Sequence, residues 1–310
     1  MIKLIQTLID GVSTGAVYAL LALGYVIIFK ATEVVTFAQG GLLLLGGYST
    51  WWFEQDGHGR LGFWPALLAG MLVAVAVAVV IERVLVRRMQ SRAAGVVSIT
   101  IMTLGLNLFM TTYVAHGVVN SGSETLSLGD PWALNSTSIG SVSIFQTRLA
   151  ALVIGSLIIA VLFAWIQRSS WGVSMRAVAE DKEAASLMGI RLGRVSLIAW
   201  AIAAALATLG AIFLTAPPSP GFDRTAGDLA LAAFPAAIVG GLDSTTGALA
   251  GGLLIGISVS LFKGYESDLT VGGFSIVGGG FSAVVPYLVM LVVLLVRPTG
   301  LFGSSQVHRA

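Results

Sequence analysis

Long apolar blocks alternate with short polar clusters along the whole chain. Counting the apolar blocks gives nine candidate helical segments, at residues 11–29, 34–53, 62–86, 93–118, 148–167, 195–216, 229–242, 245–262 and 281–297. Most of them reach the length of about 20 residues that a helix needs to cross a bilayer, whereas 229–242 is too short to cross alone. The pattern predicts an all-α polytopic integral membrane protein, one transmembrane domain over residues 1–310, with about eight or nine transmembrane helices.

Composition agrees with this fold class. Of the 310 residues, 56% are hydrophobic and only 10% are charged, against about a quarter charged in soluble domains. The basic residues are scattered at the ends of the apolar blocks and the net charge is only +2, so we expect no nucleic-acid partner. The chain contains no cysteine, which excludes disulfide and thiol chemistry.

Glycines interrupt two of the apolar blocks, near residues 36–48 and 234–247. In transporters, such interruptions mark broken helices whose freed backbone groups line a cavity. Polar residues inside other spans usually face the protein interior or a water-filled path, although hydrogen bonds between helices are the simpler interpretation for Thr103 and Asn107. We expect the translocation path to include Gln39, Gly40, Gly41, Thr103, Asn107, Gly240 and Gly241.

One polar segment, 168–194, lies between two blocks that are each long enough to span. Within it, Asp181 can cap a short helix through its side chain, with Glu180 and Glu183 near the positive end of the helix dipole, and Gly189 can close that helix. The helix would carry a small apolar surface made by Ala184, Ala185, Leu187 and Met188. A helix this short is marginal alone in water, so it needs a neighbour. A solvated loop between spans is the simpler alternative.

The basic residues predict the orientation, because cytoplasmic connections carry an excess of Lys and Arg. If the segment 168–194 is cytoplasmic, twelve of the seventeen basic residues lie inside: Lys30, Arg83, Arg87, Arg88, Arg92, Arg168, Arg176, Lys182, Arg191, Arg194, Arg297 and Arg309. Nine spans then place the N-terminus outside and the C-terminus in the cytoplasm. The longest outer connection, 119–147, either simply joins spans or meets a protein that delivers a ligand.

Motifs of membrane enzymes are absent from the sequence. It has no H-E-x-x-H of metalloproteases, no G-x-S-x-G nucleophile elbow and no Walker A motif, G-x-x-x-x-G-K-[ST]. We therefore expect a transport protein without a catalytic site or a P-loop of its own.

The residues M-R-A-V-A-E-D-x-E-A-A-x-L-M-G-I at 175–190 closely resemble the coupling loop of permease subunits of bacterial ABC importers, specifically the LivH-type branched-chain amino acid permeases. The closing RPTGLFG at 297–303 and the blocks ALLALGYVIIFKATEVVTFAQGG, IERVLVRR and AIVGGLDSTTGALAGGLLIG agree in order. The resemblance covers nearly the whole chain. It implies a multi-pass subunit of the bacterial inner membrane that forms the translocation path.

That resemblance also implies partners. A second homologous permease subunit would complete the path, two ATPase subunits would bind ATP and Mg²⁺ that this chain does not bind, and a soluble substrate-binding protein would deliver the ligand. The residues expected to contact the ATPase are Ala179, Glu180, Asp181, Glu183, Ala184, Ala185, Leu187, Met188 and Gly189.

The chain departs from the family pattern at the first break. The family usually has F-A-H-G-E where this chain has Phe37-Ala38-Gln39-Gly40-Gly41, so a histidine and a carboxylate are replaced. Related permeases serve urea and short amides, and these substrates stay open beside branched-chain amino acids. A secondary transporter driven by an ion gradient is the other alternative, because that class also uses broken helices.

Overall fold

Six helices are long and apolar enough to cross a membrane, in the part of the chain that the structure describes. The structure is a computed structural model and describes residues 2–55, 61–92, 94–117, 126, 136–139, 142–215, 221, 226–266, 270–271, 274–275 and 281–303. Shorter apolar helices at Ala230–Gly240 and Val285–Val296 accompany the six. With the 16-residue helix Gln39–Glu54, they account for all nine apolar blocks, and the predicted all-α multi-pass class is confirmed.

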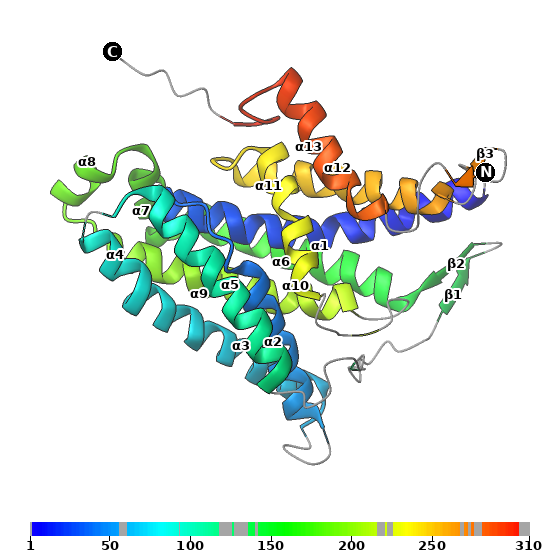
Figure 1. The fold of residues 1–310 in the computed structure, drawn as a ribbon, viewed down its shortest axis with the longest axis horizontal. Coiled ribbons are helices and arrows are strands. Elements are labelled where there is room, and N and C mark those ends of the chain that lie inside the picture. The colour runs from blue at the N-terminus through cyan, green and yellow to red at the C-terminus, as the bar shows by residue number, and fades with distance from the viewer. Residues whose placement is uncertain are drawn as a thin grey trace.

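The helices form a bundle whose long axis lies horizontally in Figure 1. They are α1 Ile2–Thr32, α2 Gln39–Glu54, α3 Phe63–Ile81, a π-helical turn Glu82–Val86, α4 Arg87–Ser91, α5 Val96–Gly117, α6 Gln146–Arg168, α7 Ser170–Glu180, α8 Lys182–Leu187, α9 Leu192–Thr215, α10 Ala226–Ala232, α11 Phe234–Gly240, α12 Thr245–Tyr265, a 3₁₀ turn Phe281–Ala283 and α13 Val285–Val296. Two short antiparallel hairpins pair β1 Ser136–Ile139 with β2 Val142–Phe145, and β3 Thr270–Val271 with β4 Phe274–Ser275. Most of the expected outer connection 119–147 lies outside the described residues.

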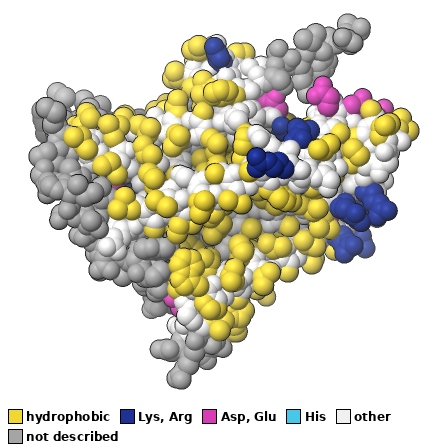
Figure 2. Space-filling view, turned by 180° about the vertical axis from the view of Figure 1, so that it is seen from behind, with side chains coloured by type: hydrophobic (Ala, Val, Ile, Leu, Met, Phe, Trp, Pro, Cys, Tyr) yellow, Lys and Arg dark blue, Asp and Glu magenta, His cyan; other side chains and the backbone are white. Residues whose placement is uncertain are grey.

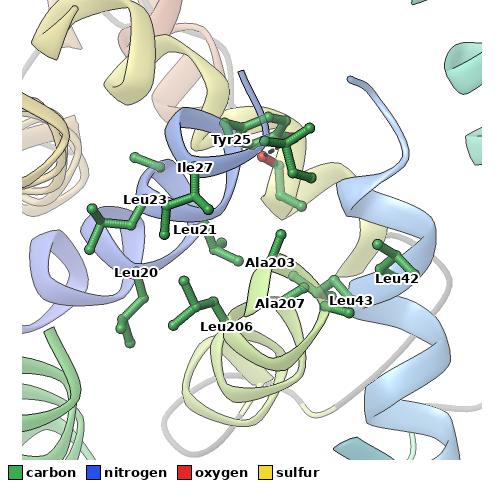
Figure 3. Close-up of a cluster of buried hydrophobic side chains, with 14 of the residues drawn as sticks. Leu20, Leu21, Leu23, Tyr25, Ile27, Leu42, Leu43, Ala203, Leu206 and Ala207 are labelled. Atoms are coloured by element: carbon green, nitrogen blue, oxygen red, sulfur yellow. Dashed lines mark hydrogen bonds between the residues drawn. The ribbon is translucent and has the colours of Figure 1, made fainter. Parts of the chain in front are cut away.

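Helix α1 is the centre of the bundle. Its residues from Ala16 to Ile28 are all buried, so it is apolar on every side, as expected of a helix surrounded by other helices. Figure 3 shows leucines of α1, Leu42 and Leu43 of α2, and Ala203, Leu206 and Ala207 of α9 in one cluster of buried side chains, with the α9 residues between the other two helices. Large side chains of α1 thus fill the space that the alanines of α9 leave free, which allows the two backbones to approach closely.

Glycines let α1 and α12 pack backbone to backbone. A Cβ added at Gly256 would collide with the backbone of Gly15, and one added at Gly252 would collide with the backbone of Ala19. Helices in lipid gain most of their association energy from such close contact, because apolar side chains are equally well solvated by lipid tails.

We expect Gly256→Leu to destabilise the protein by about 2 kcal/mol, because a large side chain must push α12 away from α1. Thermal unfolding of the purified protein in detergent measures this effect. Gly105→Leu is the matched control, since nothing lies within 4 Å of a Cβ added at Gly105. Equal melting temperatures for the two variants would contradict the close packing of α1 and α12.

The interruption expected near 36–48 is real but confined to its first part. Residues 33–38 are not helical, and α2 then begins at Gln39 and continues without a break through Gly46 and Gly47. A Cβ added at Gly46 would collide with the side chain of Thr208. Gly46 therefore serves the packing of α2 against α9.

The second interruption is a helical hairpin. Helix α11 ends at Gly240, and Gly241 has a φ of 103°, which lets the chain turn back. The Ser244 hydroxyl then accepts a hydrogen bond from the amide of Gly247 and caps α12. The segment 229–242 is divided between α10 and α11, with a kink at Ala233 and a proline, Pro235, at the start of α11.

Basic side chains gather at one end of the bundle, which we call the α8 end. Figure 2 shows Lys and Arg concentrated on the side of the molecule where α4 and α8 lie, beside a broad apolar face. Contacts from Lys30 to Asp243, from Arg87 to Gly193 and from Lys182 to Thr32 all occur at this end.

Candidate translocation path and coupling segment

Side chains of α5 accept hydrogen bonds from backbone amides at the break before α2. The side-chain oxygen of Asn107 accepts a hydrogen bond of 2.7 Å from the amide of Gly41, and the hydroxyl of Thr103 accepts one of 3.1 Å from the amide of Phe37. The first amides of a helix have no partner within the helix itself, so α5 caps α2 from outside. Thr103 and Asn107 hold the break in place, as the simpler interpretation of these two residues expected.

Gln39 differs from its polar neighbours. Its side chain is fully buried and its amide nitrogen donates to the carbonyl oxygen of Ala203 at 3.1 Å, while its Oε1 has no hydrogen-bond partner among the described residues. The space for this side chain comes from Gly24 of α1, where an added Cβ would collide with Gln39 Nε2. An unpaired buried acceptor is costly, and Gln39 Oε1 is the one unpaired side-chain acceptor of this group among the described residues.

These residues lie well inside the helix bundle, measured along α1. Gly24 is eight residues from Thr32, the last residue of α1, which corresponds to about 12 Å along the helix axis. The apolar core of a bilayer is about 30 Å thick. The structure therefore brings Gln39, Gly40, Gly41, Thr103 and Asn107 together at a depth of about 12 Å from the Thr32 end of α1, and we call them the mid-membrane cluster.

Aromatic rings flank the mid-membrane cluster. Phe234 lies between Tyr25 and Phe37, with ring centroids 5.4 and 5.2 Å apart, and the Tyr25 hydroxyl donates to the carbonyl of Ala230. The sequence interpretation did not identify these three residues. The position of Phe37 directly before the break was the available signal, whereas Tyr25 and Phe234 join it only through the fold.

Gly240 and Gly241 do not belong to the mid-membrane cluster. A Cβ added at Gly240 would collide with the backbone of Gly247, and the closing segment RPTGLFG packs on the same turn. Leu301 and Phe302 donate their amides to the carbonyls of Val239 and Gly240. The two glycines thus make the end of α11 compact enough to accept the C-terminal segment at the α8 end.

The polar segment 168–194 folds into two helices at the α8 end. The first, α7, is capped by the Ser169 hydroxyl, which accepts from the amide of Gly172. Its buried residues are spaced at helical periodicity and pack onto the bundle: Trp171, Gly172, Met175 and Val178. Ala179 and Glu180, which were expected to contact the ATPase together with the second helix, are the last residues of α7, because Asp181 has an extended backbone that separates the two helices.

The second helix, α8, has the predicted caps. The Asp181 carboxylate accepts hydrogen bonds of 2.8 and 2.9 Å from the amides of Glu183 and Ala184. Gly189 has a φ of 85°, and the amides of Gly189 and Ile190 donate to the carbonyls of Ser186 and Ala185. This is the Schellman arrangement that ends a helix at a glycine.

The apolar surface of α8 divides into two parts. Ala185 is buried against the bundle, whereas Leu187 and Met188 are 87% and 84% exposed. Ala184, Glu183 and Gly189 are also exposed beside them. Two large apolar side chains in a polar segment at the end of the bundle form a small surface suited to protein contact.

Two ionic contacts at the α8 end were missed by the sequence interpretation. Lys182 donates to the carbonyl of Thr32 at 2.7 Å and to the Glu33 carboxylate at 2.8 Å. Glu33 has a φ of 55°, which a residue with a side chain adopts at a cost of about 1 kcal/mol. Helix α1 therefore ends in a strained residue that is paired with α8.

The second contact joins α3 to α9 at the π-helical turn. The Glu82 side chain is fully buried, neither of its oxygens has a hydrogen-bond partner among the described residues, and the Arg87 guanidinium lies 3.6 Å away. Arg87 also donates to the carbonyl of Gly193 at 2.6 Å. π-Helical turns often occur at functional positions, and here the turn directs a charge pair toward the beginning of α9.

We expect Arg87→Met to lower the free energy of unfolding by about 2 kcal/mol, because it removes the positive charge that lies 3.6 Å from the buried Glu82 carboxylate. The double variant Glu82→Gln/Arg87→Met should recover part of this loss, since no charge remains buried. Thermal unfolding measures both, with Arg88→Met, an exposed residue of α4, as the control. Equal stability of Arg87→Met and Arg88→Met would show that the pair contributes nothing.

Long apolar helices around a polar mid-membrane cluster, together with an exposed helix at one end, define a multi-pass membrane protein of the transport-permease class. The family model described as "Branched-chain amino acid transport system / permease component" matches residues 7–296. The chain belongs to this family.

Individual relatives resemble the chain over nearly its whole length. The high-affinity branched-chain amino acid transport system permease protein LivH of Salmonella typhimurium is 29% identical, with 98% of this chain and 97% of the relative covered. BraD of Pseudomonas aeruginosa, a permease protein of the same description, is 28% identical over the same shares. A probable branched-chain amino acid transport permease protein LivH of Methanocaldococcus jannaschii is 30% identical, covering 92% of this chain and 88% of the relative.

Proposed function

We propose that the chain is the permease subunit of an ATP-driven importer, and that α8 is the helix on which an ATPase subunit docks. The observation that carries this proposal is the exposure of Leu187 and Met188 on a capped helix that projects from the α8 end. Two adjacent, fully accessible apolar side chains would enter a groove of a partner and supply the buried centre of an interface.

The proposed complex contains the other parts that transport requires. Two ATPase subunits bind ATP and Mg²⁺, a second homologous permease completes the path, and a soluble binding protein delivers the ligand on the opposite face. The concentration of basic side chains at the α8 end supports a cytoplasmic position for α8. In a bacterial inner membrane, this orientation places the N-terminus outside and the C-terminus inside.

Branched-chain amino acids are the proposed substrates, because the related permeases are named for their transport. The mid-membrane cluster would offer such a ligand a polar group, Gln39 Oε1, and an apolar group, the ring of Phe37, which packs on Phe234. The cluster is buried in this structure. Passage would therefore require α2, α5 and α9 to separate, and we propose that ATP-driven movement of α8 produces that separation.

Reconstitution tests the proposal. The chain is co-expressed with the ATPase, second permease and binding protein of one transport system, and uptake of labelled leucine is measured in proteoliposomes with valine, urea and acetamide as competitors. We expect uptake that requires enclosed ATP and is inhibited by valine. Inhibition by urea or acetamide alone would assign the path to amide substrates, and uptake driven by an ion gradient without ATP would overturn the importer.

A further inference from the structure

Helix α8 is joined to the mid-membrane cluster by a short continuous path through the fold. The path begins at Lys182, the first residue of α8, and its two acceptors are the carbonyl of Thr32 and the carboxylate of Glu33. Both acceptors lie at the end of α1, where helix carbonyls lack partners within the helix and a positive charge is favourable. Lys182 therefore caps α1 from a different element.

Five residues, 34–38, separate Glu33 from Gln39, and they pack against the bundle. Every second residue of this segment is buried against the bundle, namely Val34, Thr36 and Ala38. The amides of Val34 and Ala38 donate to the hydroxyls of Thr32 and Thr36, and the amide of Phe37 donates to Thr103. A segment that is buried and hydrogen-bonded in this way is suited to transmit a displacement.

Other contacts of α8 with the bundle are sparse. Ala185 is its one buried residue, and the helix has only 6 residues. Lys182 therefore provides the direct link from α8 to the end of α1, beside the indirect route through α7, which also packs on α1. Because Lys182 and Glu33 are both partly exposed, with side chains 32% and 50% accessible, their ion pair adds little to static stability.

We propose that Lys182 is the positioning residue that transmits movement of α8 through Glu33 and the segment 34–38 to Gln39. This inference rests on the proposed docking of an ATPase on α8. Displacement of α8 moves Glu33, the buried segment shifts with it, and Gln39 is drawn from its hydrogen bond with Ala203. Opening of the mid-membrane cluster is thereby linked to the state of the ATPase.

The test uses the assembled complex and measures three quantities: co-purification of the ATPase, ATP hydrolysis and substrate uptake. For Lys182→Met we expect co-purification and hydrolysis to persist while uptake per ATP falls by about tenfold, the scale of losing a charge-assisted hydrogen bond. Glu33→Gln, which keeps the bond to the Thr32 carbonyl, should lose less. Lys182→Arg should retain most uptake, and the double variant Lys182→Met/Glu33→Gln should be no worse than Lys182→Met.

Arg88→Met, which removes a basic residue at the same end of the bundle, is the matched control and should transport as the unmodified chain does. Unchanged uptake per ATP in Lys182→Met would overturn the linkage while leaving ATPase docking intact. Loss of co-purification in Lys182→Met would also overturn it, because Lys182 would then belong to the docking surface. If the unmodified chain fails to hold the ATPase, the proposed function and the linkage both fall.

Discussion

A chain carrying Leu187→Glu and Met188→Glu is expected to insert normally and to lose about 100-fold or more in affinity for its ATPase subunit. The two side chains are almost fully exposed in the isolated subunit, so they contribute little to its folding. In the complex they would be desolvated at the centre of a small interface, where truncating one large anchor typically costs about 2 kcal/mol. Introducing two carboxylates adds the cost of burying charge.

The measurement is co-purification of the ATPase with the variant, followed by titration of ATPase into the purified subunit. Phe302→Glu is the matched control, because Phe302 is also an exposed apolar residue at the α8 end. We expect the control to bind the ATPase as the unmodified chain does. Binding of Leu187→Glu/Met188→Glu with unchanged affinity would rule out α8 as the docking helix.

Gln39→Leu is expected to reduce uptake by about tenfold with little change in stability, the scale of removing one hydrogen bond to a ligand within a buried site. The folded subunit should tolerate this change, because the substitution removes an acceptor that has no partner. Its one hydrogen bond is donated to the carbonyl of Ala203. That carbonyl belongs to the backbone of helix α9 and does not depend on Gln39 for its position. The substitution should therefore weaken binding of the ligand and leave the stability of the fold nearly unchanged.

Asn107→Leu provides the contrast. It leaves the buried amide of Gly41 without its acceptor, and we expect it to destabilise the fold by about 2 kcal/mol. Uptake corrected for the amount of folded protein, together with thermal unfolding, separates the two effects. If corrected uptake falls more in Asn107→Leu than in Gln39→Leu, Gln39 is not the principal path residue.

Local sequence patterns were sufficient to predict that α8 is a helix and where it begins and ends. Asp181 and Gly189 were expected to cap a short helix, and both do so, because caps depend on residues three or four positions apart. These patterns could not predict which apolar residues of α8 are buried and which are exposed. Ala185 faces inward and Leu187 outward only because α7 fixes how α8 is turned against the bundle.

The mid-membrane cluster was foreseen in part. Gln39, Gly40 and Gly41 stand at the break, and Thr103 and Asn107 lie beside them, as expected of polar residues in apolar spans. Gly240 and Gly241 were grouped with them because glycine pairs look alike in a sequence. The structure uses that second pair for close packing against Gly247 and Gly300, a role that depends on which backbone lies opposite.

By itself, the sequence determined the membrane class, the number of apolar blocks, the polar segment between two of them and the caps of α8. These features follow from hydropathy and from interactions between near neighbours, which any chain with this pattern must satisfy. Only the tertiary structure decided that Lys182 meets Glu33, that Arg87 meets Glu82 and Gly193, and that Phe234 joins Tyr25 and Phe37. These contacts bring together residues from separate helices, and their partners are selected by how the helices pack, which no local pattern records.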